Sequence, residues 1–174
     1  WGSLFCLPAG FSFNVLRVST LVLALVGMFG AYWLAKEFRL SRWLAWLIAL
    51  GLAFNPIYYA LSYTFMTDVP FTTVCLFTAI FFFRNLKTGS DRDLAIAVAL
   101  GVAATLSRQL GLALPLAFGV VLILREGFHL RVLLRAAGPA IICAASLMLY
   151  QHWLVATNQL PPIYNEKTNK LLQV

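Results

Sequence analysis

The sequence predicts an all-α, polytopic membrane helix bundle with about six transmembrane helices. Hydrophobic residues make up 61% of the 174 positions and charged residues only 11%, with a mean hydropathy of +0.85. A soluble domain carries about 25% charged residues and roughly 45–50% apolar ones. Several apolar runs are also long enough to cross about 30 Å of hydrocarbon at roughly 1.5 Å per residue. The net charge of +7 comes from short clusters between those runs, which is typical of membrane topology and not of a nucleic-acid-binding face.

The first two spans are predicted over about residues 14–35 and 43–59. Arg17 lies near the first turn of the first span, where a long side chain can reach outward to the interface. Gly27 and Gly30 are small positions at which another helix can approach closely. A short basic segment separates the two spans and contains Lys36, Arg39 and Arg42.

A third span is predicted over about residues 69–83, after a polar and aromatic stretch at residues 55–70 that reads NPIYYALSYTFMTDVP. Asp68 and Pro70 mark the start of this span. A carboxylate is favourable at the positive end of a helix dipole, and proline lacks only an N–H that would be unpaired there. An acid at the mouth of a membrane helix is costly to place, so it indicates a functional position.

Residues 94–124 are apolar over 31 positions, or about 46 Å as one helix, which is long for a single crossing. Arg108 lies at the middle of this run, and Gly111 and Pro115, which weaken a helix, follow it. An unpaired arginine at the centre of a bilayer costs roughly 2.5–3.5 kcal/mol on insertion scales. Two shorter helices with Arg108 at their turn avoid much of that cost.

The distribution of positive charge favours the two-helix interpretation. With a final span over about residues 136–153 there are then six spans, and the basic segments 36–42, 84–93 and 125–135 share one face. Cytoplasmic loops are enriched in lysine and arginine, so this face is predicted to be cytoplasmic. The stretch 55–70, Arg108 and the tail then lie on the opposite face. Nine of the thirteen basic residues belong to the three segments: Lys36, Arg39, Arg42, Arg84, Lys87, Arg92, Arg125, Arg131 and Arg135.

Asp68 and Arg108 are the first candidates for a functional site, and each has two interpretations. Asp68 is either a helix cap, a role that stabilises a helix by roughly 0.5–2 kcal/mol, or a carboxylate that binds a hydroxyl, an amine or a metal. Arg108 either pairs with Asp68 or with backbone carbonyls, or binds a phosphate through its planar guanidinium.

Three further residues are candidate substrate-binding positions. Tyr63 belongs to an aromatic group that forms either an interfacial belt or a wall on which a sugar stacks. Glu166 and Lys167 in the tail are either solvated loop charges or substrate contacts.

Several other chemistries lack a signal. The three cysteines, Cys6, Cys75 and Cys143, lie far apart and show no metal-ligand or disulfide spacing. There is no Ser/His/Asp set, P-loop or dinucleotide-binding glycine motif. No metal site is predicted from the residues.

The order of motifs along the chain resembles the GT-C superfamily of membrane glycosyltransferases. More narrowly, it is similar to bacterial relatives of the dolichyl-phosphate-mannose protein mannosyltransferases and of the aminoarabinose lipid A transferase. The residues that carry the resemblance are Asn55 and Pro56 at the end of one span, Ser62 and Met66 to Pro70 at the entry to the next, and the run GVAATLSRQLGLALP from Gly101 to Pro115.

The resemblance implies transfer of a sugar from a polyprenyl-phosphate carrier to a lipid, glycan or protein acceptor at the extracytoplasmic face of the plasma (inner) membrane. It implies that Asp68 is a catalytic residue that helps form the acceptor or metal site, and that Arg108 contacts the carrier phosphate. A divalent metal is left open as a cofactor, because metal use varies within the superfamily. Residues 1–174 are expected to be part of one transmembrane domain that is truncated at both ends and lacks the main catalytic acid.

Two other function classes compete with this interpretation. A transporter or lipid-carrier flippase would show inverted repeats and charged residues within its spans, and no convincing repeat is present. A non-catalytic membrane scaffold is the third possibility, and an acidic outer loop encoded upstream would argue against it.

Overall fold

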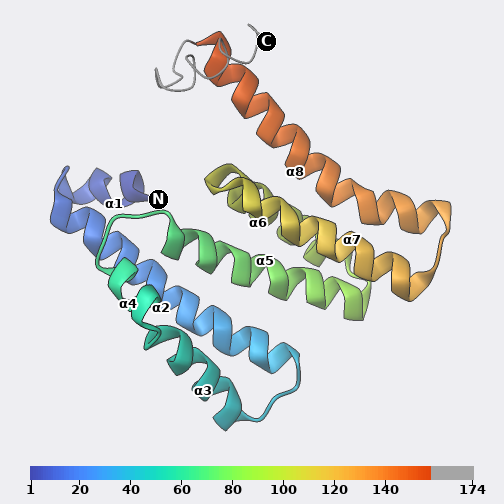
Figure 1. Ribbon diagram of the computed structural model, residues 1–174, viewed down its shortest axis with the longest axis horizontal. Helices are drawn as coiled ribbons and strands as arrows, with labels where there is room; N and C mark the ends of the chain where they lie inside the picture. Colours follow the sequence, from blue (N-terminus) through green and yellow to red (C-terminus); the bar gives the residue numbers. More distant parts are fainter. Residues whose placement is uncertain (158–174) are drawn as a thin grey trace, which may run out of the picture.

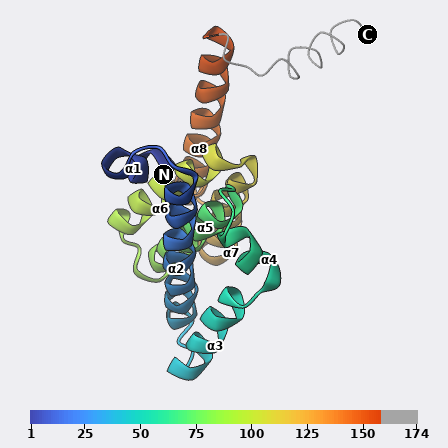
Figure 2. The ribbon, with the colours of Figure 1, turned by 90° about the vertical axis from the view of Figure 1, so that its left-hand side faces the viewer.

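The computed structural model describes residues 1–157, which form helices and no strand (Figure 1). Helix α2 packs against α3 and α5, α5 packs against α6, and α8 packs against α6 and α7. In the view of Figure 2, α3 and α4 lie to one side of α2. In chain order the elements are α1 (Gly2–Ala9), α2 (Phe13–Glu37), α3 (Arg42–Ala53), α4 (Pro56–Ser62), α5 (Asp68–Thr88), α6 (Asp91–Ser107), the 3-10 helix η1 (Gln109–Leu112), α7 (Ala113–Glu126) and α8 (Leu130–Ala156).

The prediction of a helical membrane bundle is confirmed, but the count of six spans is too high. Within the described residues, four helical segments are long and apolar enough to cross a membrane: α2, α5, η1 with α7, and α8. The pair α3 and α4 would make a fifth if it is counted as one broken span. Helix α6 is only 17 residues long, or about 25 Å, and its first turn carries three charged side chains. It therefore lies at the lower limit of the roughly 17–25 residues of a spanning helix and is not among the four segments.

The second predicted span, residues 43–59, is also not a single helix. It breaks between α3 and α4 with a bend of 62°. The Oδ1 atom of Asn55 accepts hydrogen bonds from the backbone N–H groups of Ile57 (3.0 Å) and Tyr58 (3.2 Å), and Pro56 occupies the first turn. An asparagine cap followed by proline is a strong start signal for a new helix, so the chain begins α4 here and does not continue α3.

The predicted break at Arg108 is present. Helix α6 ends at Ser107, and Arg108 has an extended backbone with φ −152° and ψ 136°. Helix α6 runs antiparallel to α5, because Ser90 at its start follows α5 directly and Arg108 at its end contacts Asp68 at the start of α5. The chain therefore returns to the Asp68 end of the bundle before α7 begins.

The basic segments lie together at the opposite end, as the sequence predicts. Glu37 at the end of α2 accepts a hydrogen bond from Arg84 of α5 at 2.6 Å, and Lys87 is ion-paired with the same carboxylate at 3.5 Å. Arg125 of α7 donates to the carbonyl of Leu86 at 2.5 Å. These contacts join the ends of α2, α5 and α7 that lie away from Asp68 into one charged face.

A close three-helix contact at Gly27 holds α2, α4 and α5 together. The hydroxyl of Tyr58 donates to the carbonyl of Ala24 at 3.1 Å, and the hydroxyl of Thr73 donates to the carbonyl of Leu23 at 2.9 Å. Both side chains pass over Gly27, where a Cβ atom would lie 2.6 Å from Thr73 Oγ1 and closer still to the Tyr58 hydroxyl. The prediction that a helix approaches closely at this glycine is confirmed.

Replacing Gly27 with alanine is expected to lower the free energy of unfolding by about 1–3 kcal/mol, because the added methyl group would displace both hydroxyls from their carbonyl acceptors. The measurement is thermal unfolding of the purified protein in detergent. Gly51→Ala is the matched control, since a Cβ at Gly51 meets no atom within 4 Å. Equal stability of the two variants would show that the contact at Gly27 is loose.

Candidate functional site

The structure brings Asp68 and Arg108 together at one end of the bundle, although 40 positions separate them in the sequence. Nη2 of Arg108 lies 2.7 Å from Oδ2 of Asp68. Asp68 is the first residue of α5, and Arg108 is the residue at which α6 ends. The two side chains are 33% and 37% exposed, so the ion pair is partly accessible from outside the bundle.

Thr67 completes this site. Its Oγ1 atom accepts from both Nε and Nη2 of Arg108 at 3.3 Å. Thr67 occupies the N-cap position of α5 but makes no side-chain capping hydrogen bond, so its hydroxyl serves the arginine. The ring of Phe71 lies beside the guanidinium, 5.9 Å from its central carbon. The arginine is therefore held in one orientation by three neighbouring side chains of the α5 start.

The positions of Asp68 and Arg108 bear on the two roles that the sequence allows for each residue. The pairing of Arg108 with Asp68, one of the expected alternatives, is present. The capping interpretation of Asp68 gains no support, because Thr67 is the cap residue and α5 has no side-chain cap. The favourable position of the carboxylate in the first turn remains. A partly exposed carboxylate and a partly exposed guanidinium then lie side by side, and together they can bind a ligand with a hydroxyl and a phosphate.

The aromatic stretch before Asp68 divides into buried and exposed members. Tyr58 is 8% exposed and packs inside the bundle, so it is not part of a sugar-binding wall. Tyr63 is about half exposed, and its hydroxyl donates to that of Tyr59 at 3.2 Å. That hydrogen bond raises the pKa of the Tyr63 phenol. A substrate-binding role for Tyr63 stays a prediction.

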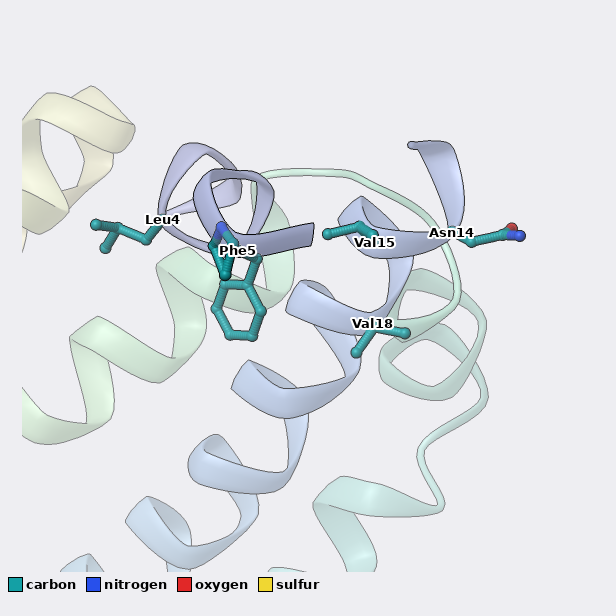
Figure 3. Close-up of a pocket in the computed structure, with 6 residues that line it drawn as sticks. Leu4, Phe5, Asn14, Val15 and Val18 are labelled. Atoms are coloured by element: carbon teal, nitrogen blue, oxygen red, sulfur yellow. The ribbon is translucent and has the colours of Figure 1, made fainter. Parts of the chain in front are cut away.

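Helix α1 covers part of the Asp68 end of the bundle. The ring of Trp1 lies 5.2 Å from that of Phe65, three positions before Asp68. A cleft of about 450 Å³ between α1 and α2 has an apolar lining apart from Asn14 (Figure 3). Its lining has no acidic or basic side chain, so the cleft can hold an apolar group but supplies no acid or base for catalysis. From the sequence, Thr67 was included in the motif Met66 to Pro70 without an assigned role, and the Trp1–Phe65 contact was not predicted.

Two expectations from the sequence, the tail residues and a metal cofactor, are not part of this arrangement. Glu166 and Lys167 lie outside the described residues 1–157. Within those residues, no three His, Cys, Asp or Glu side chains come together as metal ligands. Among residues 1–157, Asp68 is the only carboxylate at this end, and it is paired with Arg108. A divalent metal as cofactor stays a prediction.

A comparison with protein families identifies the chain. The family model described as dolichyl-phosphate-mannose-protein mannosyltransferase matches residues 3–156. The chain belongs to this family. No curated protein and no solved structure matches the chain.

Membership in the mannosyltransferase family confirms the resemblance to GT-C glycosyltransferases. Together with the apolar helices it indicates a multi-pass membrane glycosyltransferase. The family description also indicates a lipid-linked sugar donor and an acceptor in general terms. The match includes both Asp68 and Arg108, so the ion pair lies within the part of the chain that is similar to the family. The transporter and scaffold alternatives gain no support from it.

Proposed function

We propose that this glycosyltransferase moves a sugar from a polyprenyl-phosphate carrier to an acceptor hydroxyl or amine at the extracytoplasmic face, and that Asp68 and Arg108 serve the reaction. The observation that carries the proposal is the 2.7 Å contact between the two side chains at the open end of the bundle. It is the only ion pair found at this end among the described residues.

Arg108 is suited to the leaving group. As the bond between the sugar C1 and the phosphate oxygen breaks, negative charge develops on the polyprenyl phosphate. A guanidinium that is already positioned can stabilise that charge without reorganising. The group has five N–H donors, of which Nε and Nη2 contact Thr67 and Nη2 also contacts Asp68. The Nη1 donors remain for the phosphate.

Asp68 is suited to the acceptor. Its carboxylate takes the proton of the acceptor hydroxyl or amine as the new glycosidic bond to C1 forms, and the phosphate departs with the electron pair of the broken bond. A carboxylate acts as a general base in this way when it lies within hydrogen-bond reach of the proton.

The charge distribution supports the extracytoplasmic placement. The basic segments lie at the opposite end of the bundle from Asp68, and such segments are retained in the cytoplasm. The Asp68 end then faces away from the cytoplasm, where a lipid-linked sugar that has crossed the membrane is available. We further propose that the membrane is the plasma (inner) membrane.

Labelling of single reporter cysteines tests this orientation. In a variant that lacks the three native cysteines, we expect cysteines at Thr67 and Thr157 to react with a membrane-impermeant reagent in intact cells. A cysteine at Ser41, between α2 and α3, is the matched control and is expected to react only after the membrane is permeabilised. Labelling of Ser41→Cys in intact cells would contradict the orientation.

A transfer assay tests the chemistry. Membranes that contain the full-length enzyme to which residues 1–174 belong are given radiolabelled polyprenyl-phosphate mannose, which follows the family description, and then other lipid-linked sugars. The proposal requires transfer of label to a membrane acceptor, release of polyprenyl phosphate, and dependence on the Asp68 carboxylate. Failure with every lipid-linked sugar would contradict it.

A further inference from the structure

The turn between α2 and α3 contains the one strained backbone position among the described non-glycine residues. Arg39 has φ +58°, in the left-handed region. Side chains with a Cβ adopt this region at an energetic cost, and glycine adopts it freely. An arginine at such a position therefore calls for a reason beyond the turn itself.

The hydrogen bonds of the turn show which residue its geometry favours. The N–H of Leu40 donates to the carbonyl of Ala35 at 3.3 Å, and the N–H of Arg39 donates to the carbonyl of Lys36 at 2.9 Å. This is a Schellman motif, in which the position taken by Arg39 is usually glycine. The same chain uses a glycine for this purpose at the end of α5, where Gly89 has φ 69° and ψ 10°. Arg39 thus occupies a position at which the backbone conformation favours glycine.

The side chain of Arg39 also has no role inside the bundle. Among residues 1–157, neither Arg39 nor the neighbouring Arg42 makes a side-chain hydrogen bond or ion pair, and both are exposed. Most other basic side chains at this end of the bundle bind groups within the protein. Lys36 donates to the carbonyl of Leu40, Arg84 and Lys87 bind Glu37, Arg125 binds the carbonyl of Leu86, and Arg135 binds Asp91 and the carbonyl of Gly89.

Two other cations of this end, Arg92 and Arg131, likewise make no such contact among the described residues. They lie within the first turns of α6 and α8, on ordinary helical backbone. Among the described residues, only Arg39 combines a cation that makes no hydrogen bond or ion pair with a strained backbone.

The neighbours of the two arginines indicate where the turn lies. Trp43 is 83% exposed and Phe38 is 56% exposed, although both flank a charged turn at the end of spanning helix α2. Exposed aromatic rings beside basic residues are typical of the boundary between lipid headgroups and acyl chains. A turn at that boundary would place the guanidinium groups of Arg39 and Arg42 level with the headgroup phosphates.

We propose that Arg39 and Arg42 form a binding site for the headgroup of an anionic phospholipid, with Phe38 and Trp43 against its acyl chains. A guanidinium binds phosphate oxygens in a bidentate manner, and basic side chains next to a spanning helix bind anionic lipids of the cytoplasmic leaflet. The left-handed backbone takes Arg39 out of helix α2, three positions before Arg42 at the start of α3. The site is independent of the proposed sugar transfer.

The Arg39→Gly variant tests the site because the fold and the lipid respond in opposite directions. In detergent without lipid, we expect Arg39→Gly to unfold at a higher temperature than the wild-type protein, since the strain is removed. Native mass spectrometry is used to compare binding of phosphatidylglycerol with binding of phosphatidylcholine. We expect the wild-type protein to prefer phosphatidylglycerol, and Arg39→Gly and Arg42→Gln each to weaken phosphatidylglycerol binding about fivefold.

Arg17→Gln is the matched control, because Arg17 is an exposed arginine near the other end of α2. It is expected to leave phosphatidylglycerol binding unchanged. Three outcomes would overturn the proposal: no preference for phosphatidylglycerol in the wild-type protein, unchanged binding in Arg39→Gly, or an equal loss in Arg17→Gln. The last of these would show an effect of total charge and not of a site.

Discussion

Replacing Asp68 with asparagine is expected to reduce sugar transfer by roughly 10²- to 10⁴-fold, the range that a positioned general base contributes. Asparagine has nearly the same shape and still accepts a hydrogen bond from Arg108. It cannot take a proton from the acceptor, and its neutral amide does not balance the guanidinium. The loss should therefore appear in kcat while the protein still accumulates in the membrane. The measurement is transfer of radiolabelled sugar from the lipid-linked donor, normalised to protein amount.

Asp93→Asn is the matched control. Asp93 is also a carboxylate in the first turn of a helix, α6, but it lies at the basic end of the bundle. The substitution removes a similar interaction with a helix dipole, worth about 0.3–1 kcal/mol, and should leave transfer unchanged. If Asp68→Asn is as active as the wild-type protein, the carboxylate only stabilises the start of α5. If both variants lose activity equally, helix stability and not chemistry explains the loss.

The break of residues 94–124 into two helices could be predicted because it depends on local and large energies. An arginine in the middle of an apolar run is costly, and the glycine and proline that follow it weaken the helix. The break in turn places the basic segments at one end, which the contact between Arg125 and Leu86 bears out. The number of spans could not be predicted as well. Helix α6 has 17 residues and charged first-turn side chains, so it lies at the limit where hydropathy separates a span from a shorter buried helix.

The site itself was only partly accessible to sequence reasoning. Asp68 and Arg108 could be found singly, because each is a charged residue in an apolar setting. Their contact requires that α5 and α6 are antiparallel and of nearly matching length. The turn at Gly89 and Ser90 sets this packing, which becomes visible only in the folded structure. The role of Thr67 had no sequence signal, since a threonine before a helix is ordinarily read as its cap. Likewise, Tyr58 reads as an interfacial aromatic residue, but its hydroxyl binds the Ala24 carbonyl inside the bundle.

Replacing Arg108 with alanine is expected to raise the KM for the lipid-linked donor by roughly 10- to 100-fold, which corresponds to the loss of a charged hydrogen bond of about 1.5–3 kcal/mol. It should also lower kcat, because the charge that develops on the departing phosphate is no longer stabilised. Arg108→Lys keeps the charge but loses the bidentate geometry, so its KM should lie between those of the wild-type protein and the alanine variant. The measurement is a series of transfer rates at increasing donor concentration in membranes.

Arg92→Ala is the matched control, since Arg92 is an exposed arginine at the other end of the same helix, α6, and makes no side-chain contact among the described residues. It should leave the donor KM unchanged. The alternative for Arg108 is a structural anchor that fastens the end of α6 to the start of α5. In that case the alanine variant would fail to accumulate, and lysine, which can still pair with Asp68, would restore the protein amount.

The double variant Asp68→Asn with Arg108→Ala separates the two roles further. Residues that act as a unit show effects that do not add, so a double variant no less active than Asp68→Asn alone would show that the ion pair works as one catalytic element. Additive losses would show that Arg108 binds the donor independently of Asp68.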